Sequence, residues 1–483
     1  MDKIHEKYKI QPMYIDGCWI GHESEHLTEV NNPATGEILA AVPTGGAVEA
    51  KQAVDAAYRA FPLWSQKTAD ERFAIMIKWF ALIQEHKEEM AEIMTKEQGK
   101  PFKEALGEVG YANSFISWYA EEGKRIYGES IPASHKDKRI FVRKEPVGVV
   151  AALTPWNFPA AMITRKVGPA LAAGCTVVVK PASQTPLTAL KMAELAHQAG
   201  IPPGVINVVT GRSSEIGESW LKDSRVRKIT FTGSTAVGKT LMRGAAETVK
   251  KISLELGGNA PFIILKDADL KKAAKGVVQS KFRNAGQTCI CTNRIYVQEE
   301  VAASFTEWFI KELQQLKVGN GMDEGVDIGP MIDMDAKEKV KEFMEDALDK
   351  GAAISYQSKE ELAADCCFFP PTILTGASED MLCMKEEIFG PIAPIAAFKH
   401  IEEVIERAND SLYGLAAYVY SENISNALKV TEALEYGIIG LNDALPSVAQ
   451  APFGGYKESG LGREGGHHGI DEFLEVKFIS LGL

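Results

Sequence analysis

The sequence predicts an α/β protein with a Rossmann-like, doubly wound parallel sheet and a second α/β unit. Three observations predict this fold. From residue 147 onward, short runs of Val, Ile and Leu alternate with helix-like segments, the pattern of a parallel sheet with helices on both faces. A second alternating series begins at residue 260. The chain has 483 residues, enough for two or three separate cores.

The region before the first sheet is predicted to be mostly helical between residues 47 and 125. The segments AVEAKQAVDAAYRAFPLW and ERFAIMIKWFALIQEHKEEMAEIMTKEQG both carry apolar residues at the three-to-four spacing of a helix face. The stretch RIFVRKEPVGVVA at 139–151 then predicts one strand. The helical region should therefore lead directly into the first sheet.

Five apolar runs predict the strands of the first sheet, namely VGVVAALTP, CTVVVKP, VINVVTG, RKITFTGS and KKISLELGG. Helices are expected between them, at 161–172, at 186–199, in EIGESWLKD and in TAVGKTLMRGAAE. The loops at the carboxyl ends of such strands are where a dinucleotide binds. The first sheet is therefore predicted to form a dinucleotide-binding domain from residues 1–125 and 147–256.

The second series starts with APFIILKDADL, continues through RIYVQ and predicts a catalytic domain over 257–445. The tail, EFLEVKFISLGL, alternates between apolar and polar residues and predicts an edge strand. Such a strand needs a partner, either in this chain or in a second subunit. We therefore expect a homo-oligomer, with dimer and tetramer both open.

Composition and charge exclude several classes of function. The chain is 45% hydrophobic and 24% charged, its net charge is -12, and no basic block stands out, so we expect no nucleic-acid partner. The N-terminus has no apolar signal-peptide core, and the most apolar stretch is too short to span a bilayer, so we expect no membrane association. Seven cysteines without metal-ligand spacing predict a reducing, cytoplasmic setting and no metal site.

The segment NAGQTCICTNR at 284–294 holds two candidate nucleophiles, Cys289 and Cys291. A thiolate is the reactive form of cysteine, and an exposed turn entering a strand or helix is a setting that lowers a thiol pKa. Two inert, partly buried thiols are the alternative. The spacing by itself does not choose between the two residues.

Two further side chains follow predicted strands. Glu255 ends the strand in LELGG, where a carboxylate in partly apolar surroundings can act as a general base; the alternative is a salt-bridged loop residue. Asn157, in TPWNFP, could donate to an oxyanion, or could simply lie in a turn beside proline. The segment GSTAVG at 233–238 follows a strand and opens a helix, as a phosphate-binding loop does.

Together these motifs resemble the aldehyde dehydrogenase superfamily. TPWNFP, KPA, FTGS, LELGG, GQTC, EEIFGP and PFGGYKESGLGREGG occur in that order between residues 154 and 466, and NPATGE lies at 32–37. The resemblance implies that Cys289 is the nucleophile, Glu255 the base that activates water, and Asn157 with the Cys289 backbone N–H the oxyanion hole. It also implies a small oligomerisation flap formed by residues 126–146 and 460–483.

The same resemblance implies a nicotinamide cofactor and the residues that bind it: Trp156, Asn157, Lys180, Gly233, Ser234, Leu256, Glu387 and Phe389. Many NAD-preferring members carry Glu at the position of Ser183, whose carboxylate binds the ribose 2′-hydroxyl and repels a 2′-phosphate. A neutral Ser183 beside Lys180 therefore predicts preference for NADP, with NAD also possible.

The aldehyde is predicted from TPWNFPAAMITRK and FRNAGQTCICTNR, which resemble the succinate-semialdehyde dehydrogenases, enzymes used in 4-aminobutyrate breakdown. The resemblance implies that Arg165, Arg283 and Ser447 hold the distal carboxylate, and a guanidinium suits that task. Glutarate semialdehyde, or another short ω-carboxy aldehyde, is the alternative, since one methylene discriminates weakly. The resemblance further implies a reversible Cys289–Cys291 disulfide that switches the enzyme off, with a spectator thiol as the alternative.

Rival functions are less well supported by the residues. A CoA-acylating member of the superfamily would not need the water-activating Glu255, and Arg165 with Arg283 disfavours a cationic aldehyde. A non-catalytic structural or binding protein on the same fold should have lost Cys289, Glu255 or Asn157, and all three are present.

Overall fold

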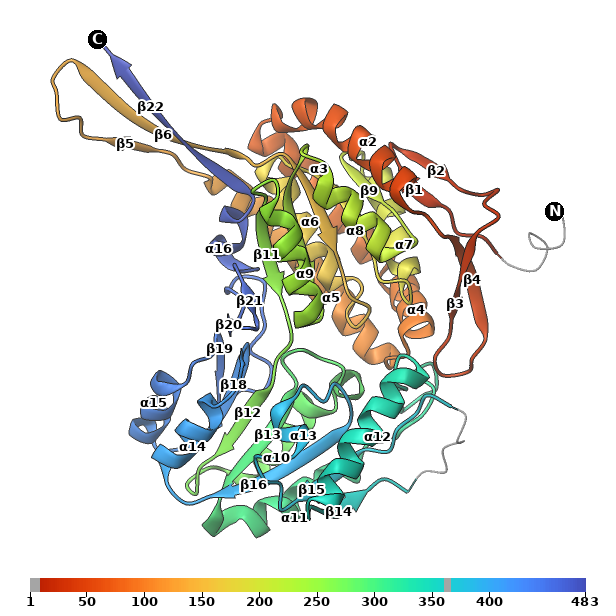
Figure 1. The fold of residues 1–483 in the computed structure, drawn as a ribbon, viewed down its shortest axis with the longest axis vertical. Coiled ribbons are helices and arrows are strands. Elements are labelled where there is room, and N and C mark those ends of the chain that lie inside the picture. The colour runs from red at the N-terminus through yellow and green to blue at the C-terminus, as the bar shows by residue number, and fades with distance from the viewer. Residues whose placement is uncertain (1–8, 360–365) are drawn as a thin grey trace.

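The computed structural model describes residues 9–359 and 366–483, and its chain forms two α/β lobes and a projecting arm (Figure 1). The first lobe holds an eight-stranded sheet in the order β2-β1-β9-β8-β7-β10-β11-β21. Its parallel strands are β7 (Val149–Leu153), β8 (Thr176–Lys180), β9 (Ile206–Val208), β10 (Val226–Thr232) and β11 (Lys251–Glu255). The antiparallel flanks are β1 (Met13–Ile15), β2 (Cys18–Ile20) and β21 (Gly460–Leu461).

The first sheet is doubly wound, as its sequence pattern predicts. From β7 the chain moves outward through β8 and β9, then returns to the other side of β7 with β10 and β11. Val150 and Ala152 of β7 face one core, and Val149 and Ala151 face another. The switch point between β7 and β10 is the place where an open parallel sheet of this kind binds its ligand.

Helices cover both faces of this sheet. The first core joins α3 (Ala69–Glu85), α4 (Lys87–Gln98), α5 (Phe102–Glu122), α6 (Ala161–Ala173) and α7 (Pro186–Gln198). The second core joins α2 (Ala47–Ser65), α8 (Ser213–Lys222) and α9 (Thr235–Ala246). The prediction of a mostly helical region over 47–125 is therefore confirmed, with η1 (Gly123–Arg125) at its end.

The second lobe holds a seven-stranded sheet that is parallel except at one edge. The order is β14 (Ala353–Gln357), β15 (Thr372–Thr375), β16 (Ile392–Phe398), β13 (Thr292–Gln298), β12 (Ala260–Ile264), β18 (Ala416–Tyr420) and β19 (Ile438–Leu441), with β14 antiparallel. The lobe also contains α10 (Leu270–Lys281), η2 (Arg283–Gly286), η3 (Glu299–Val301), α11 (Ala302–Leu313), α12 (Met334–Asp349), α13 (Leu382–Lys385), α14 (Ile401–Asn409) and α15 (Ile424–Ala433).

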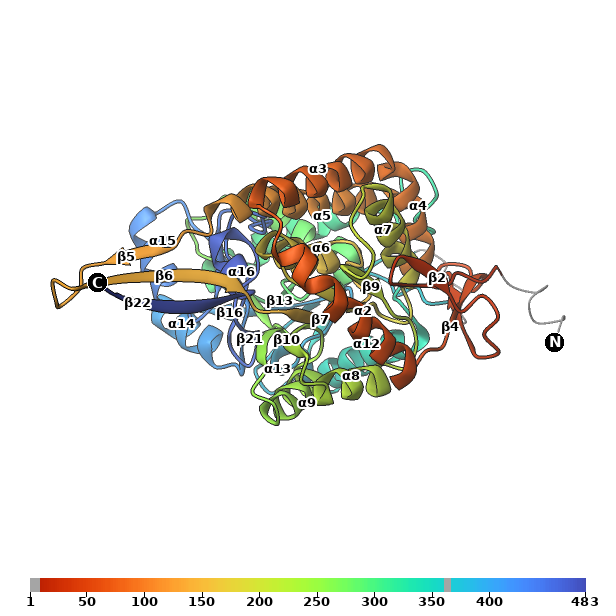
Figure 2. The same cartoon turned by 90° about the horizontal axis from the view of Figure 1, so that it is seen from above.

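The arm is a three-stranded sheet, β22-β6-β5, that extends away from both lobes (Figures 1 and 2). β22 (Leu474–Gly482) runs antiparallel along β6 (Lys138–Pro146), which also pairs with β5 (Glu129–Ile131). The predicted tail strand thus finds its partner within the chain. β22 also carries exposed apolar side chains, with Val476 and Phe478 on one face of the strand and Leu481 on the other.

The expectation of one strand over 139–151 is wrong. This run contains two strands of different sheets, β6 in the arm and β7 in the first lobe, separated at Val147 and Gly148. Gly148 has φ +125, a conformation that glycine adopts readily and that redirects the chain here. Apolar residues continue through the break, because Ile140 and Val142 of β6 are half-buried and β7 is buried on both faces.

The predicted domain boundaries remain a prediction, although the strands show how residues 460–483 divide. β21 joins the first sheet beside β11, and α16 (Gly466–Asp471) packs on α5 and α6, so β22 is the part of this range that belongs to the arm. Two small sheets complete the fold: β3 (Leu27–Asn31) with β4 (Ile38–Pro43), and β17 (Tyr413–Gly414) with β20 (Tyr456–Lys457). Within the described residues, no helix is both long and apolar enough to cross a membrane.

Candidate active site

The candidate nucleophile lies on a turn at the entrance to β13. Cys289 follows η2, in which Asn284 and Ala285 have positive φ values of 53 and 54. This left-handed stretch is uncommon for residues other than glycine and commonly marks functional sites. A Cβ at Gly258 would lie 2.3 Å from the Cys289 carbonyl oxygen, so only glycine permits the loop after β11 to pass this closely.

The expectation that the turn lowers the thiol pKa is wrong. Burial is the main cause that raises the pKa of Cys289 to about 12, and the negative charge of Glu387 adds to it. Arg165 opposes the shift, without offsetting the burial. The thiol is therefore protonated at neutral pH, and its ionisation requires an added positive charge or a base.

Cys291 differs from Cys289, although only one residue separates them. It is buried, and its thiol donates to the carbonyl oxygens of Lys281 and Thr292, both at 3.3 Å. Cys289 lines the cavity described below, whereas Cys291 is not among the lining residues. The structure therefore distinguishes Cys289 from Cys291 as the candidate nucleophile, whereas the sequence spacing could not.

Glu255 occupies the carboxyl end of β11, as predicted from LELGG. Its side chain is buried, and among the described residues Oε2 has no hydrogen-bond partner. Burial and the charge of Glu464 raise the pKa of Glu255 well above its ordinary value, although Arg165 and Lys166 oppose the shift. A raised pKa makes the ionised carboxylate a stronger base, and its unsatisfied oxygen can accept a proton from water, as a general base must.

Asn157 joins the loop after β7 to the loop that carries the nucleophile. Its Nδ2 donates to the backbone carbonyl oxygen of Gln287 at 3.0 Å. The backbone carbonyl oxygen of Asn157 accepts from Asn284 Nδ2 at 3.0 Å and from Lys100 Nζ at 2.7 Å. Gln98 Nε2 in turn donates to Asn284 Oδ1 at 2.9 Å. This buried network fixes Asn157 beside the Cys289 turn.

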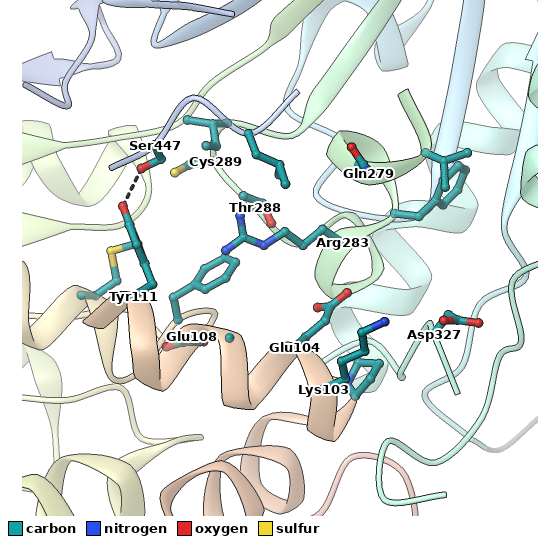
Figure 3. Close-up of a pocket in the computed structure, with 18 of the residues that line it drawn as sticks. Lys103, Glu104, Glu108, Tyr111, Gln279, Arg283, Thr288, Cys289, Asp327 and Ser447 are labelled. Atoms are coloured by element: carbon teal, nitrogen blue, oxygen red, sulfur yellow. Dashed lines mark hydrogen bonds between the residues drawn. The ribbon is translucent and has the colours of Figure 1, made fainter. Parts of the chain in front are cut away.

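A cavity of about 560 Å³ opens beside Cys289 (Figure 3). The three predicted substrate-binding residues, Arg165, Arg283 and Ser447, all line it together with the nucleophile. They come from α6, from η2 and from the segment after β19. Its walls also include Phe158, Phe453, Met162, Tyr111 and Glu104. The cavity thus combines a thiol, two guanidinium groups and an apolar lining.

The two arginines are held in different ways. Arg165 is buried, its Nε lies 2.9 Å from Glu464 Oε2 in an ion pair poorly aligned for a hydrogen bond, and its Nη2 has no hydrogen-bond partner among the described residues. Arg283 is half-buried, and its guanidinium lies over the Phe158 ring at 4.8 Å. Both therefore retain N–H donors that an incoming carboxylate can accept.

Sequence reasoning missed two residues of this site, Tyr111, which lies outside every motif, and Glu464, which lies within PFGGYKESGLGREGG but was given no role. Tyr111 Oη lies 2.5 Å from Ser447 Oγ, across 336 positions of the chain. Glu464 is bound by both Arg165 and Lys166. For Tyr111, the available signal was its helical spacing with Glu104 and Glu108 on one face of α5, which also fits an ordinary packed helix.

The predicted cofactor residues gather along the carboxyl edge of the first sheet and opposite it. Lys180 ends β8, Gly233 follows β10, and Ser234 caps α9 by accepting from the Val237 N–H at 3.4 Å. From the second lobe, Glu387 Oε1 accepts from the Gly258 N–H at 3.0 Å. Trp156 and Phe389 meet edge to face with centroids 5.5 Å apart, and Leu256 is buried at the end of β11.

Lys180 is the strongest sign that this edge accepts an anion. Its Nζ donates to the Pro181 carbonyl oxygen at 2.8 Å and to Ser183 Oγ at 3.2 Å, and in the described part of the chain it forms no ion pair. Burial lowers the pKa of Lys180 to about 8. A buried amine with neutral partners is stabilised by a phosphate or a ribose oxygen, so the residues present fit a nicotinamide dinucleotide.

Comparison with known proteins gives a consistent result. The aldehyde dehydrogenase family model matches residues 19–479. The chain is 53% identical over 473 residues to the NADP+-dependent succinate-semialdehyde dehydrogenase of Escherichia coli, covering 98% of both chains. It is 52% identical over 471 residues to the glutarate-semialdehyde dehydrogenase of Pseudomonas putida, again covering 98% of both. The crystal structure of succinate-semialdehyde dehydrogenase from Burkholderia pseudomallei matches with TM-score 0.96 and 51% identity, covering 100% of this chain and 99% of that one. The chain therefore belongs to the aldehyde dehydrogenase family.

Proposed function

We propose that this enzyme oxidises succinate semialdehyde to succinate, with NADP+ as the preferred acceptor. The observation that carries the proposal is the shared cavity, in which Cys289 lies with Arg165 and Arg283. A four-carbon aldehyde with a terminal carboxylate has its reactive carbon and its charge within one short molecule. The buried, unpartnered Nη2 of Arg165 supports an anionic rather than a neutral substrate.

The chemistry follows from the placement of three residues. The Cys289 thiol releases its proton to solvent and Sγ attacks the aldehyde carbon, while the Cys289 N–H and an Asn157 N–H donate to the oxygen that becomes negative. Loss of two electrons and a proton from this adduct leaves a thioester on Cys289. Glu255 then takes a proton from water as it attacks the thioester, which releases the carboxylate and restores the thiol.

A bound nicotinamide dinucleotide supplies the two-electron acceptor for the oxidation. The residues proposed to hold it are Lys180 and Ser183 at the ribose, Gly233 and Ser234 at the start of α9, and Glu387. Lys180 adds positive charge and Ser183 adds a neutral donor, which supports a 2′-phosphate. No carboxylate of the described residues lies within ion-pair distance of Lys180 to repel that group.

The deciding experiment compares initial rates of NADPH formation with succinate semialdehyde and with butanal. Both aldehydes have four carbons, and they differ in the distal carboxylate. We expect kcat/KM to favour the acid by about a hundredfold or more, because charged hydrogen bonds contribute on the order of 1.5–3 kcal/mol each. Equal rates would show that the arginines do not recognise a carboxylate.

Glutarate semialdehyde is the second candidate, and the relative from Pseudomonas putida supports testing it. The two acids differ by one methylene, which discriminates by roughly ten- to two-hundredfold. Measuring both in the same assay decides between them. An Arg283→Met variant tests the clamp, since it keeps an unbranched side chain and removes the guanidinium that lies over Phe158. It should lower the preference for either acid over butanal.

A redox role for Cys291 remains a prediction. Its thiol is buried and bonded to two carbonyl groups, so a disulfide with Cys289 requires the 287–291 turn to rearrange. Peroxide inactivation that dithiothreitol reverses in the wild type should become irreversible in Cys291→Ala, because Cys289 then lacks a resolving thiol. Cys383→Ala, another buried thiol, serves as control. Identical inactivation and recovery in all three proteins would make Cys291 a spectator.

Assembly and location are proposed on separate grounds. The exposed apolar side chains of β22 and its unpaired edge support a homo-oligomer joined through the arm, as a dimer or a tetramer. The seven cysteines are all free thiols, which supports a reducing, cytoplasmic setting.

A further inference from the structure

One face of α5 lines the cavity with polar side chains, and two of them have structural partners. Glu108 forms a buried ion pair with Lys100 and accepts from the Ala160 N–H at 3.0 Å. Glu104 accepts from the Asn284 N–H at 2.9 Å. Tyr111 instead directs its hydroxyl to Ser447, near Cys289 (Figure 3).

The contact between Tyr111 and Ser447 joins two unlike segments. Ser447 lies in the stretch 445–448, which has neither helix nor strand. Tyr111 belongs to α5, a 21-residue helix packed along α6. Within the described residues, the Ser447 side chain forms one hydrogen bond, to Tyr111, with an Oη–Oγ distance of 2.5 Å. The serine hydroxyl is therefore held by the helix rather than by its own segment.

Tyr111 also lies close to Arg165. Its ring meets Phe115 edge to face at 5.1 Å, and the Arg165 guanidinium lies 5.5 Å from the same Phe115 ring. Burial opposes the charged guanidinium, but the acidic groups around it, Glu464 and Glu255 among them, raise the pKa of Arg165 above its ordinary value. Tyr111 thus borders two of the three residues proposed to bind the carboxylate.

We propose that Tyr111 is a positioning and specificity-determining residue, whose hydroxyl orients the Ser447 O–H toward the distal carboxylate of the substrate. A serine has a single proton to donate. If Tyr111 donates to Ser447 Oγ, that proton stays available to the carboxylate, and the bond polarises the serine O–H. This inference rests on the proposed function.

The test measures kcat and KM for succinate semialdehyde and butanal in the wild type, Tyr111→Phe, Ser447→Ala and the double variant. Tyr111→Phe removes one oxygen and keeps the ring on Phe115. We expect kcat/KM for the acid to fall about tenfold, mainly through KM, and at least fivefold more than for butanal. Because Tyr111 acts through Ser447, the double variant should resemble Ser447→Ala.

Tyr14→Phe is the matched control, because it removes a phenol that hydrogen bonds His197 Nδ1 at 3.0 Å, outside the cavity. An equal loss on both aldehydes in Tyr111→Phe, or losses that multiply in the double variant, would overturn the inference while the proposed function stands. If the wild type already treats the two aldehydes alike, the carboxylate assignment fails, and the role of Tyr111 fails with it.

Discussion

The two sheets present their functional residues at opposite ends of their strands. In the first sheet, Lys180 and Glu255 end β8 and β11, and Gly233 follows β10, so the groups lie at carboxyl ends. In the second sheet, Cys289 precedes β13, and Glu387 precedes β16, so the groups lie at amino ends. The site forms where the carboxyl edge of one sheet meets the amino edge of the other.

This difference shows which half of such a site general rules can locate. Ligands of open parallel sheets bind beyond the carboxyl ends of the strands, so the first sheet follows a rule that can be applied from sequence. The second sheet does not follow it. Its loops are placed by close packing against the first lobe, as at Gly258, where a Cβ would meet the Cys289 carbonyl oxygen.

The largest expected effect comes from removing the group at the amino end of β13. Cys289→Ala should lower kcat by at least about ten-thousandfold, because no other thiol lines the cavity in the described residues. Binding of NADPH, followed by its fluorescence, should change by less than about threefold, because the first sheet is untouched. If NADPH binding were lost together with activity, cofactor binding at the first sheet would depend on Cys289 of the second sheet.

Glu255 departs from this division between the two sheets, because it lies at the carboxyl end of a strand in the first sheet and yet acts on the thioester of Cys289 in the second lobe. Glu255→Gln should slow thioester hydrolysis by roughly a hundred- to ten-thousandfold and leave a burst of NADPH in stopped-flow traces. Since the pKa of Glu255 is raised, the carboxyl loses its proton only as pH rises, so wild-type hydrolysis should increase with pH through that pKa. The variant should lack this increase; a burst that disappears would instead place Glu255 in the first chemical step.

The smallest effect should come from Ser183, which lies beyond the carboxyl end of β8. Ser183→Glu should shift the ratio of kcat/KM for NADP+ over NAD+ toward NAD+ by about ten- to a hundredfold, because the carboxylate repels a 2′-phosphate. The preference for succinate semialdehyde over butanal should stay within about twofold. Gln184→Glu, one residue further along and exposed, adds the same charge as a control. An unchanged ratio of kcat/KM for NADP+ over NAD+ would show that Ser183 does not contact the ribose 2′ position.

Much of the fold could be read from local patterns. The strands of the first sheet and the helices between them follow from runs of buried Val and Ile and from helical spacing. The break at Gly148 could not be predicted from these patterns, because apolar residues continue across it while the chain leaves one sheet for another. Periodicity reports which side of a strand is buried, and it does not report against which sheet.

The candidate site divides in the same way. Cys289, Glu255 and Asn157 were expected from motifs, and the structure gathers them at one interface. Tyr111 lies outside every motif, and the motif PFGGYKESGLGREGG contains Glu464 without indicating its partner, because the two roles depend on Ser447 and Arg165, which lie 336 and 299 positions away.

By itself, the sequence determined the fold class, the family resemblance and the residues able to perform the chemistry, because these depend on local spacing and residue type. Only the tertiary structure decided that Cys289 faces a cavity while Cys291 faces the core. It also decided that burial raises the pKa of the Cys289 thiol and that Arg165 keeps an N–H donor with no partner among the described residues. These properties depend on burial and on charges brought together from distant segments, which linear spacing does not encode.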